Sequence, residues 1–115
     1  MILEFKFRNF RSAKDWQILS FEASADKISE EYYCTTINDT KVLKLGILYG
    51  ANASGKTNVL LALDFIRKIA ISPKINKMQP IGFTPFLLDD TTKKECGVFE
   101  LTFFVNNKIG RASCR

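Results

Sequence analysis

Eight residues near the middle of the chain read Gly50-Ala51-Asn52-Ala53-Ser54-Gly55-Lys56-Thr57. They match the pattern G-x-x-x-x-G-K-[ST] of a phosphate-binding loop at every fixed position. The apolar run at residues 45–49 predicts a buried strand before the loop, and residues 58–70 predict a helix after it. Strand, loop and helix therefore stand in the order that this motif requires.

The residue types of the loop suit a polyphosphate. A helix N-terminus offers unpaired N–H groups and the positive end of the helix dipole, so we expect the backbone of residues 52–56 to surround the phosphates. Gly50 and Gly55 suit a tight loop that phosphate approaches closely. We expect Lys56, the predicted catalytic residue, to contact the β- and γ-phosphates, and the Thr57 hydroxyl to be a ligand of Mg²⁺. The motif does not distinguish ATP from GTP.

Composition is that of an ordinary globular domain. The chain has 115 residues, of which 46% are hydrophobic and 25% are charged. No apolar run approaches the roughly 20 residues needed to cross a bilayer, and the N-terminus lacks a signal-peptide pattern. We expect a cytoplasmic protein without a membrane partner. The three cysteines, Cys34, Cys96 and Cys114, are far apart and there is no histidine, so we assign them no metal or redox chemistry.

The net charge depends partly on the last residues of the chain. It is +5, from 17 basic and 12 acidic residues, and the basic residues are scattered, which favours a solvated surface over a nucleic-acid site. Residues 109–115, reading Ile-Gly-Arg-Ala-Ser-Cys-Arg, resemble a translated sequencing adapter. Without Arg111 and Arg115 the basic count falls from 17 to 15 and the charge to +3. We predict that residues 1–108 belong to the domain and that residues 109–115 are a non-native tail.

Alternation of residue types predicts a hairpin before the loop. Leu3, Phe5 and Phe7 alternate with charged residues, as in a strand that buries one face. Residues 17–21 predict a second strand, antiparallel to the first. Residues 24–44 are polar and mixed, and we expect a connection with a short helix or strand around residues 28–33.

Beyond the loop, the predicted helix carries a stripe that we expect to pack into the core: Leu60, Leu63, Ile66 and Ile69. Ser72-Pro73 marks the predicted end of the helix. Residues 98–105 predict a strand, and residues 106–108 predict a turn. We expect no returning strand after that turn, which would leave residues 99–105 as an unpaired apolar edge and the isolated chain poorly soluble.

Two stretches together resemble a known family: Phe5-Lys6-Phe7-Arg8-Asn9-Phe10-Arg11-Ser12 and Leu48 to Asn58. They are similar to the head of an ABC-type ATPase, as in RecF and the structural-maintenance-of-chromosomes proteins. The resemblance is strongest to AAA-family ATPases of the overcoming-lysogenization-defect and abortive-infection kind, which Pro85-Phe86-Leu87-Leu88-Asp89-Asp90 followed by Phe99-Glu100-Leu101-Thr102-Phe103 also resembles. It implies an α/β fold that is the N-terminal portion of a P-loop NTPase. This portion consists of an antiparallel hairpin followed by a strand, the P-loop and a helix, and it is an incomplete P-loop domain.

The resemblance also implies roles for residues outside the fixed motif positions. Asn58 joins the nucleotide-binding residues, and Arg11 lies near the nucleotide, although a surface arginine in a hairpin turn is an equal alternative. Gln79 is a candidate for the glutamine that senses metal and water in such ATPases. Ala53 stands where many relatives have glycine, and we expect it to leave binding intact. The predicted nucleotide-binding residues are then Arg11, Gly50, Ala51, Asn52, Ala53, Ser54, Gly55, Lys56, Thr57 and Asn58.

The implied mechanism places ATP and Mg²⁺ between two heads of a homodimer, with DNA, a nuclease or a toxin as candidate partners. The chain has no apolar strand ending in Asp-Glu and no Leu-Ser-Gly-Gly-like segment, which catalysis in these ATPases uses. We therefore expect ATP binding as part of an ATPase in phage defence or DNA maintenance, with little or no turnover by these residues alone. The alternatives are another P-loop class, such as a GTPase or small-molecule kinase, and a non-hydrolysing nucleotide-binding assembly module.

Overall fold

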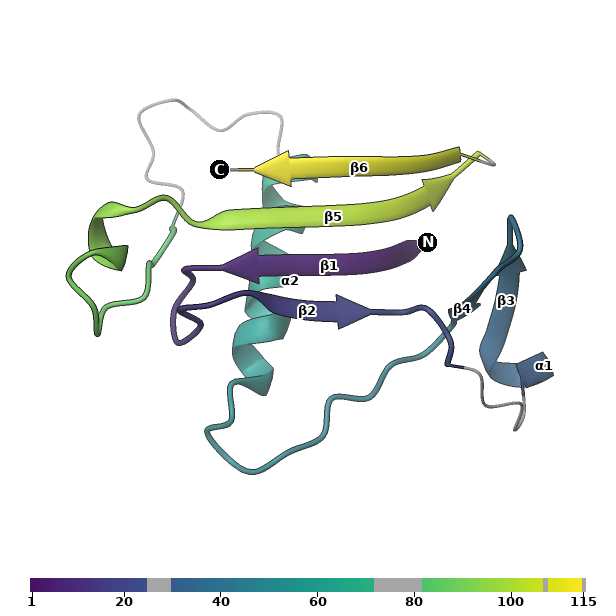
Figure 1. The fold of residues 1–115 in the computed structure, drawn as a ribbon, viewed down its shortest axis with the longest axis horizontal. Coiled ribbons are helices and arrows are strands. Elements are labelled where there is room, and N and C mark those ends of the chain that lie inside the picture. The colour runs from purple at the N-terminus through teal and green to yellow at the C-terminus, as the bar shows by residue number, and fades with distance from the viewer. Residues whose placement is uncertain (25–29, 72–81, 107, 115) are drawn as a thin grey trace.

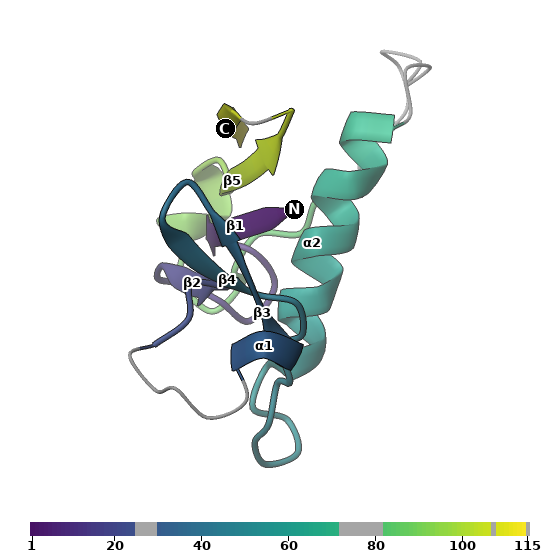
Figure 2. The same cartoon turned by 90° about the vertical axis from the view of Figure 1, so that its right-hand side faces the viewer.

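The computed structural model describes residues 1–24, 30–71, 82–106 and 108–114. They form a four-stranded sheet with one long helix against one face (Figure 1, Figure 2), and a separate two-stranded hairpin. In chain order the elements are β1 (Ile2–Arg8), β2 (Gln17–Ser20), α1 (Glu30–Tyr33), β3 (Cys34–Ile37), β4 (Thr40–Leu43), α2 (Lys56–Ile71), the 3₁₀ turn η1 (Thr92–Lys94), β5 (Val98–Val105) and β6 (Lys108–Cys114).

Strand β1 is one of the two inner strands of the large sheet. The strand order is β2-β1-β5-β6, and each neighbouring pair is antiparallel. Leu3, Phe5 and Phe7 are buried and alternate with more exposed residues. On the other face Lys6 pairs with Glu4, with Nζ and Oε1 3.0 Å apart. The predicted alternation and the predicted hairpin with β2 are both confirmed. The alternation arises because an antiparallel sheet can bury one face and leave the other in water.

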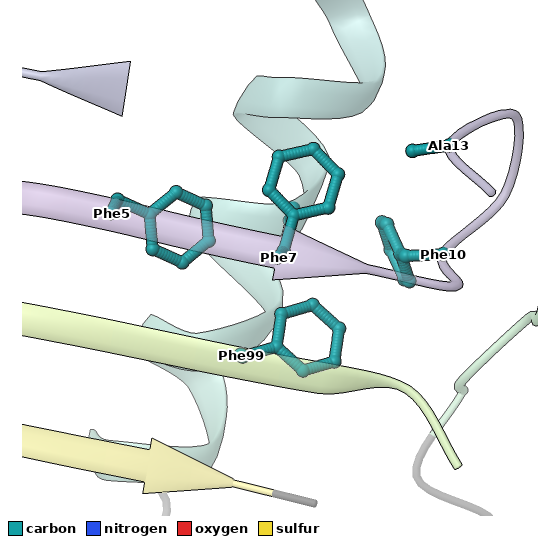
Figure 3. Close-up of a cluster of buried hydrophobic side chains, with 6 residues drawn as sticks. Phe5, Phe7, Phe10, Ala13 and Phe99 are labelled. Carbon is teal, nitrogen blue, oxygen red and sulfur yellow. The ribbon is translucent and has the colours of Figure 1, made fainter. Parts of the chain in front are cut away.

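Aromatic rings fill the space between the sheet and α2. The buried residues of this cluster are Phe5, Phe7, Phe10, Ala13, Ala62 and Phe99. Figure 3 shows Phe5 and Phe7 along β1 with Phe99 on the neighbouring β5. Phe65 of α2 reaches the same cluster, and its ring centroid lies 5.0 Å from that of Phe99. Each fully buried phenylalanine contributes roughly 1.5–3 kcal/mol, so burial of this cluster stabilises the fold by several kcal/mol.

Helix α2 confirms the predicted helix, and Leu63 and Ile66 of the predicted stripe pack against the core. Ala62 is completely buried, and Phe65 and Ile66 pack against the aromatic cluster. Leu60 is 59% exposed, so its assignment to the core is wrong. A helix turns 100° per residue, and the face centred on Ala62 meets the sheet because its small side chain lets the helix approach closely.

The segment before the loop is the main difference from the predicted fold. Residues 45–49 form no strand, and Ile47 and Tyr49 are 82% and 99% exposed. A strand needs a neighbour for its N–H and C=O groups, and among the described residues none pairs with this segment. The buried strand predicted here is therefore wrong. The described chain is a mixed α/β fold, and the parallel sheet of a complete P-loop fold is not seen in it.

The connection between the first hairpin and the loop contains more structure than predicted. Helix α1 agrees with the short element expected there, and residues 25–29 lie outside the described residues. The hairpin of β3 and β4 is not among the predicted elements. Its turn residues Asn38 and Asp39 have φ of 45° and 65°, values that asparagine and aspartate tolerate well. The Asn-Asp pair between β-branched residues is the sequence signal that indicates this turn.

The C-terminal strands correct another prediction. Strand β5 has the predicted bounds, but β6 returns after the turn, so β5 is paired on both sides. The prediction of an unpaired edge is wrong. Gly110 lies under the Phe103 ring, where a β-carbon would come within 2.7 Å of it. Strand pairing does not report the origin of residues 109–115, and the non-native tail stays a prediction.

Two further points concern the limits of the described chain. The candidate Gln79, together with Ser72-Pro73 at the predicted helix end, lies outside the described residues. Helix α2 ends at Ile71, directly before that point. None of the described helices has the length and apolarity to cross a membrane.

Candidate functional site

The loop at residues 50–55 leads directly into helix α2. The carbonyl of Gly55 accepts bonds from the amides of Asn58 (2.9 Å) and Val59 (3.3 Å), so the first turn of the helix starts from it. Gly55 has φ of 91° and Ala53 has φ of 62°. The left-handed region is open to glycine, but in it alanine is strained by about 1–2 kcal/mol. The loop therefore holds one strained residue, Ala53.

Lys56 is folded back over its own loop. Its Nζ donates to the carbonyls of Gly50 (2.8 Å) and Ala51 (2.5 Å), and lies 3.4 Å from the Ser54 hydroxyl. An ammonium group has three donors, and these three oxygens satisfy them. The positive charge of Lys56 is thus held at the concave side of the loop.

The start of α2 carries the features that bind anions. The first amides of a helix have no intrahelical carbonyl to bond, and the helix dipole adds positive potential there. In α2 the amides of Asn58 and Val59 already donate to Gly55, which leaves those of Lys56 and Thr57. Thr57 is exposed in that turn. Its hydroxyl suits Mg²⁺, which takes oxygen ligands and completes its shell with water and phosphate oxygens. Among the described residues no cluster of three His, Cys, Asp or Glu could hold a metal. The role of Thr57 as a metal ligand stays a prediction.

A cleft of about 400 Å³ lies between the loop and the turn that joins β1 to β2. Such a volume is within the ~300–1,000 Å³ range of small-ligand sites. Its polar lining residues are Ser12, Gln17, Tyr49, Ser54, Lys56 and Asn58. The two walls are joined by a hydrogen bond of 2.5 Å from Asn58 Nδ2 to Ser12 Oγ. No described carboxylate lines the cleft.

The predicted site residues fall into two groups. Ser54, Gly55, Lys56 and Asn58 line the cleft. The others of the loop and first turn are exposed and do not line it: Gly50, Ala51, Asn52, Ala53 and Thr57. The structure therefore brings the C-terminal half of the loop to the cleft.

Arg11 lies at the tip of the β1–β2 turn and does not line the cleft. It is exposed, and its guanidinium carbon is 5.8 Å from the centroid of the Phe10 ring. The next residue, Ser12, faces the cleft instead. Sequence reasoning gives Ser12 no role, although the Arg11-Ser12 pair in the family-like stretch places it one residue away.

Comparison with known families agrees with this geometry. Residues 46–112 match the family described as "AAA domain, putative AbiEii toxin, Type IV TA system". The match contains the loop, all of α2 and β5. No curated protein and no solved structure matches the chain. Because the family match covers more than half of the chain, we conclude that the chain belongs to this family of P-loop ATPase domains.

Proposed function

We propose that this chain binds Mg-ATP through the loop at residues 50–57. Membership of an AAA family implies nucleotide binding, and the observation that carries the finer proposal is the position of Lys56. Its ammonium already sits among three loop oxygens, beside the open N-terminus of α2. Phosphate oxygens are stronger acceptors for this ammonium than neutral carbonyls, because with phosphate both partners of the hydrogen bond carry charge.

Within this proposal, the loop backbone of residues 50–55 surrounds the phosphates and Thr57 supplies one oxygen to Mg²⁺. Asn58 and Ser12 form the wall next to the phosphates. Bound Mg²⁺ would neutralise phosphate charge, and the remainder of its ligands would be water and phosphate oxygens.

The experiment is a calorimetric titration of the chain with Mg-ATP. We expect Lys56→Ala to weaken binding by roughly 10- to 100-fold, the range for one charge-assisted hydrogen bond. Lys94→Ala is the matched control, since Lys94 is an exposed lysine of η1 that does not line the cleft. Equal affinity in wild type and Lys56→Ala would reject the proposal. Competition by GTP against ATP measures base preference, which the loop sequence leaves open.

We also propose that this chain alone binds ATP with little or no turnover. Hydrolysis needs a group that positions or deprotonates water, and no described carboxylate lines the cleft. Sustained Mg²⁺-dependent phosphate release that disappears in Lys56→Ala would overturn this. The family description supports a biological setting in abortive infection or a toxin–antitoxin system. A homodimer of two ATPase heads is part of the proposal and rests on the resemblance to ABC-type ATPases alone.

A separate proposal concerns the origin of residues 109–115. We propose that the native domain contributes residues 1–108 and that the last seven residues derive from an adapter. Sequencing the source gene beyond the Lys108 codon with an independent library chemistry tests this. A different sequence after Lys108 supports it, and Ile109 to Arg115 followed by a stop codon would contradict it and favour a self-contained binding module.

A further inference from the structure

The turn at residues 9–15, between β1 and β2, has a backbone that needs outside support. Phe10 and Ala13 exchange two backbone hydrogen bonds, of 3.0 and 2.9 Å, so Arg11 and Ser12 form a two-residue tip. Arg11 has φ of 53°, a region unfavourable for a residue with a β-carbon. Such conformations persist where surrounding contacts impose them, and they concentrate at functional sites.

The outside support comes from the segment at residues 84–95. Asn9, at the start of the turn, is 2% exposed and uses its whole carboxamide on this segment. Its Nδ2 donates to the carbonyls of Thr92 (2.8 Å) and Glu95 (3.0 Å), and its Oδ1 accepts from the amide of Phe86 (2.9 Å). Three backbone groups spread over ten residues are thus gathered by one side chain.

Two further contacts join the same parts. The amide of Arg11 donates to the carbonyl of Thr84 at 2.9 Å. Lys14 pairs with Asp89 on the surface, with Nζ and Oδ2 2.5 Å apart. The segment at residues 84–95 therefore holds both flanks and the tip of the turn.

On its opposite side the same turn meets the phosphate loop. Ser12 Oγ accepts the hydrogen bond from Asn58 Nδ2, and a β-carbon built on Gly55 would lie 3.8 Å from that oxygen. The position of Ser12 in the cleft is consequently set by a turn whose anchor is Asn9, three residues earlier.

We propose that Asn9 is a positioning residue for the loop site. By fastening the turn to residues 84–95, it keeps Ser12 against Asn58 and closes the wall of the cleft next to the phosphates. Asn9 itself does not line the cleft. The consequence for ligand binding rests on the nucleotide-binding function proposed above.

Asn9→Asp is the sharpest test, because it keeps the shape and replaces the amide donor with an oxygen that faces two carbonyls. Asn38→Asp is the matched control: Asn38 has φ of 45°, lies exposed in the β3–β4 turn and undergoes the same change in charge. We expect about tenfold weaker Mg-ATP binding for Asn9→Asp, which corresponds to loss of the hydrogen bond between Asn58 and Ser12 in the cleft wall. We expect unchanged binding for Asn38→Asp.

A double-mutant cycle with Ser12→Ala separates positioning from general destabilisation. If Asn9 acts through Ser12, the double variant binds no more weakly than the weaker single variant. Additive losses would overturn the proposal. Thr92→Val serves if Asn9→Asp does not fold, since it removes only the hydroxyl bonds to the carbonyls of Phe86 and Asp89, both 3.0 Å, within the supporting segment. We expect a smaller loss of affinity with the same dependence on Ser12.

A nucleotide-free measurement keeps this inference separate from the proposed function. The side-chain amide signals of Asn58 in an NMR spectrum report its bond to Ser12 directly. We expect them to shift in Asn9→Asp or Thr92→Val and to stay in place in Asn38→Asp. Shifted signals in a chain that never binds nucleotide would reject the proposed function and keep the coupling from Asn9 to the loop. Unchanged signals in folded Asn9→Asp and Thr92→Val would overturn the coupling.

Discussion

Two stretches of this chain that are rich in apolar residues differ in whether they form a buried strand. Residues 2–8 form β1, whose apolar face lies under α2, whereas residues 45–49, which contain no charged residue, form no strand and are exposed. The difference is the presence of neighbours. Strand β1 has β2 and β5 on its two sides, and the Phe7 ring packs against Phe10 of the following turn and Phe99 of β5. Apolar composition makes a strand possible, and a neighbour on the sheet makes it form.

The strongest way to break this comparison is to truncate one residue in each stretch. Phe7→Ala removes a ring that is 1% exposed, and we expect it to lower the free energy of unfolding by about 3–5 kcal/mol. Ile47→Ala removes a side chain that is 82% exposed, and we expect a change within about 0.5 kcal/mol. Urea denaturation followed by circular dichroism measures both. Similar losses for the two variants would show that residues 45–49 are buried in solution.

A smaller effect on the free energy of unfolding is expected when glycine replaces alanine in the loop rather than in helix α2. We expect Ala53→Gly to leave the unfolding free energy unchanged or to raise it by up to about 1 kcal/mol, because glycine relieves the left-handed backbone but adds entropy to the unfolded chain. Ala70→Gly, near the end of α2, should lower it by up to about 1 kcal/mol. The measurement is the denaturation midpoint. A clear loss for Ala53→Gly would show that the strained conformation is absent in solution.

The smallest effect concerns the surface pair that joins the turn at residues 9–15 to residues 84–95. The hydrogen bond from Lys14, followed by those from Thr91, holds the pKa of Asp89 well below its ordinary value, and the hydrogen bond to Asp89 raises the pKa of Lys14. A carboxyl group whose pKa is lowered in the fold stabilises it at pH values above the ordinary pKa of about 3.9. This stabilisation is lost as the pH falls through the folded pKa. A raised lysine pKa stabilises below about 10.4 and loses that effect as the pH rises through the folded pKa.

We therefore expect Asp89→Asn to be slightly less stable than wild type by the same amount from about pH 5 to pH 9, with the difference vanishing in strong acid. Thermal denaturation across this range measures it. Asp90→Asn is the control, because Asp90 is a neighbouring carboxylate that pairs with Lys93 instead. A difference that grows on acidification would contradict the assigned direction of the Asp89 pKa.

The comparison also explains which parts of the fold could be predicted from sequence. Strand β1, strand β5 and helix α2 have strong periodic patterns of their own, and all three predictions are confirmed. Residues 45–49 have an equally clear pattern, but their burial depends on partners that their own sequence does not specify. The predicted stripe on α2 is wrong at Leu60 for a related reason, since small Ala62 marks the face that meets the sheet.

For the candidate site, the division lies between local and distant contacts. The loop is a local motif, so the residues from Gly50 to Asn58 can be identified from the sequence alone, and their predicted roles in binding remain predictions. Ser12 meets Asn58 across 46 positions of sequence, and no periodicity connects them. Asn9 stands in a family-like stretch that assigns it no role, although its side chain joins residues 77 and 83 positions away.

The folded-back position of Lys56 has a consequence for what the loop can select. The ammonium has the oxygens of Gly50, Ala51 and Ser54 as partners. A ligand must exchange those partners for its own, so only the difference between the two sets favours binding. A neutral ligand offers this lysine little that it lacks, whereas an ionised phosphate does. If Lys56 contacts the ligand as proposed, we therefore expect this loop to favour highly charged ligands such as polyphosphates. This preference would not depend on the shape of a base or sugar.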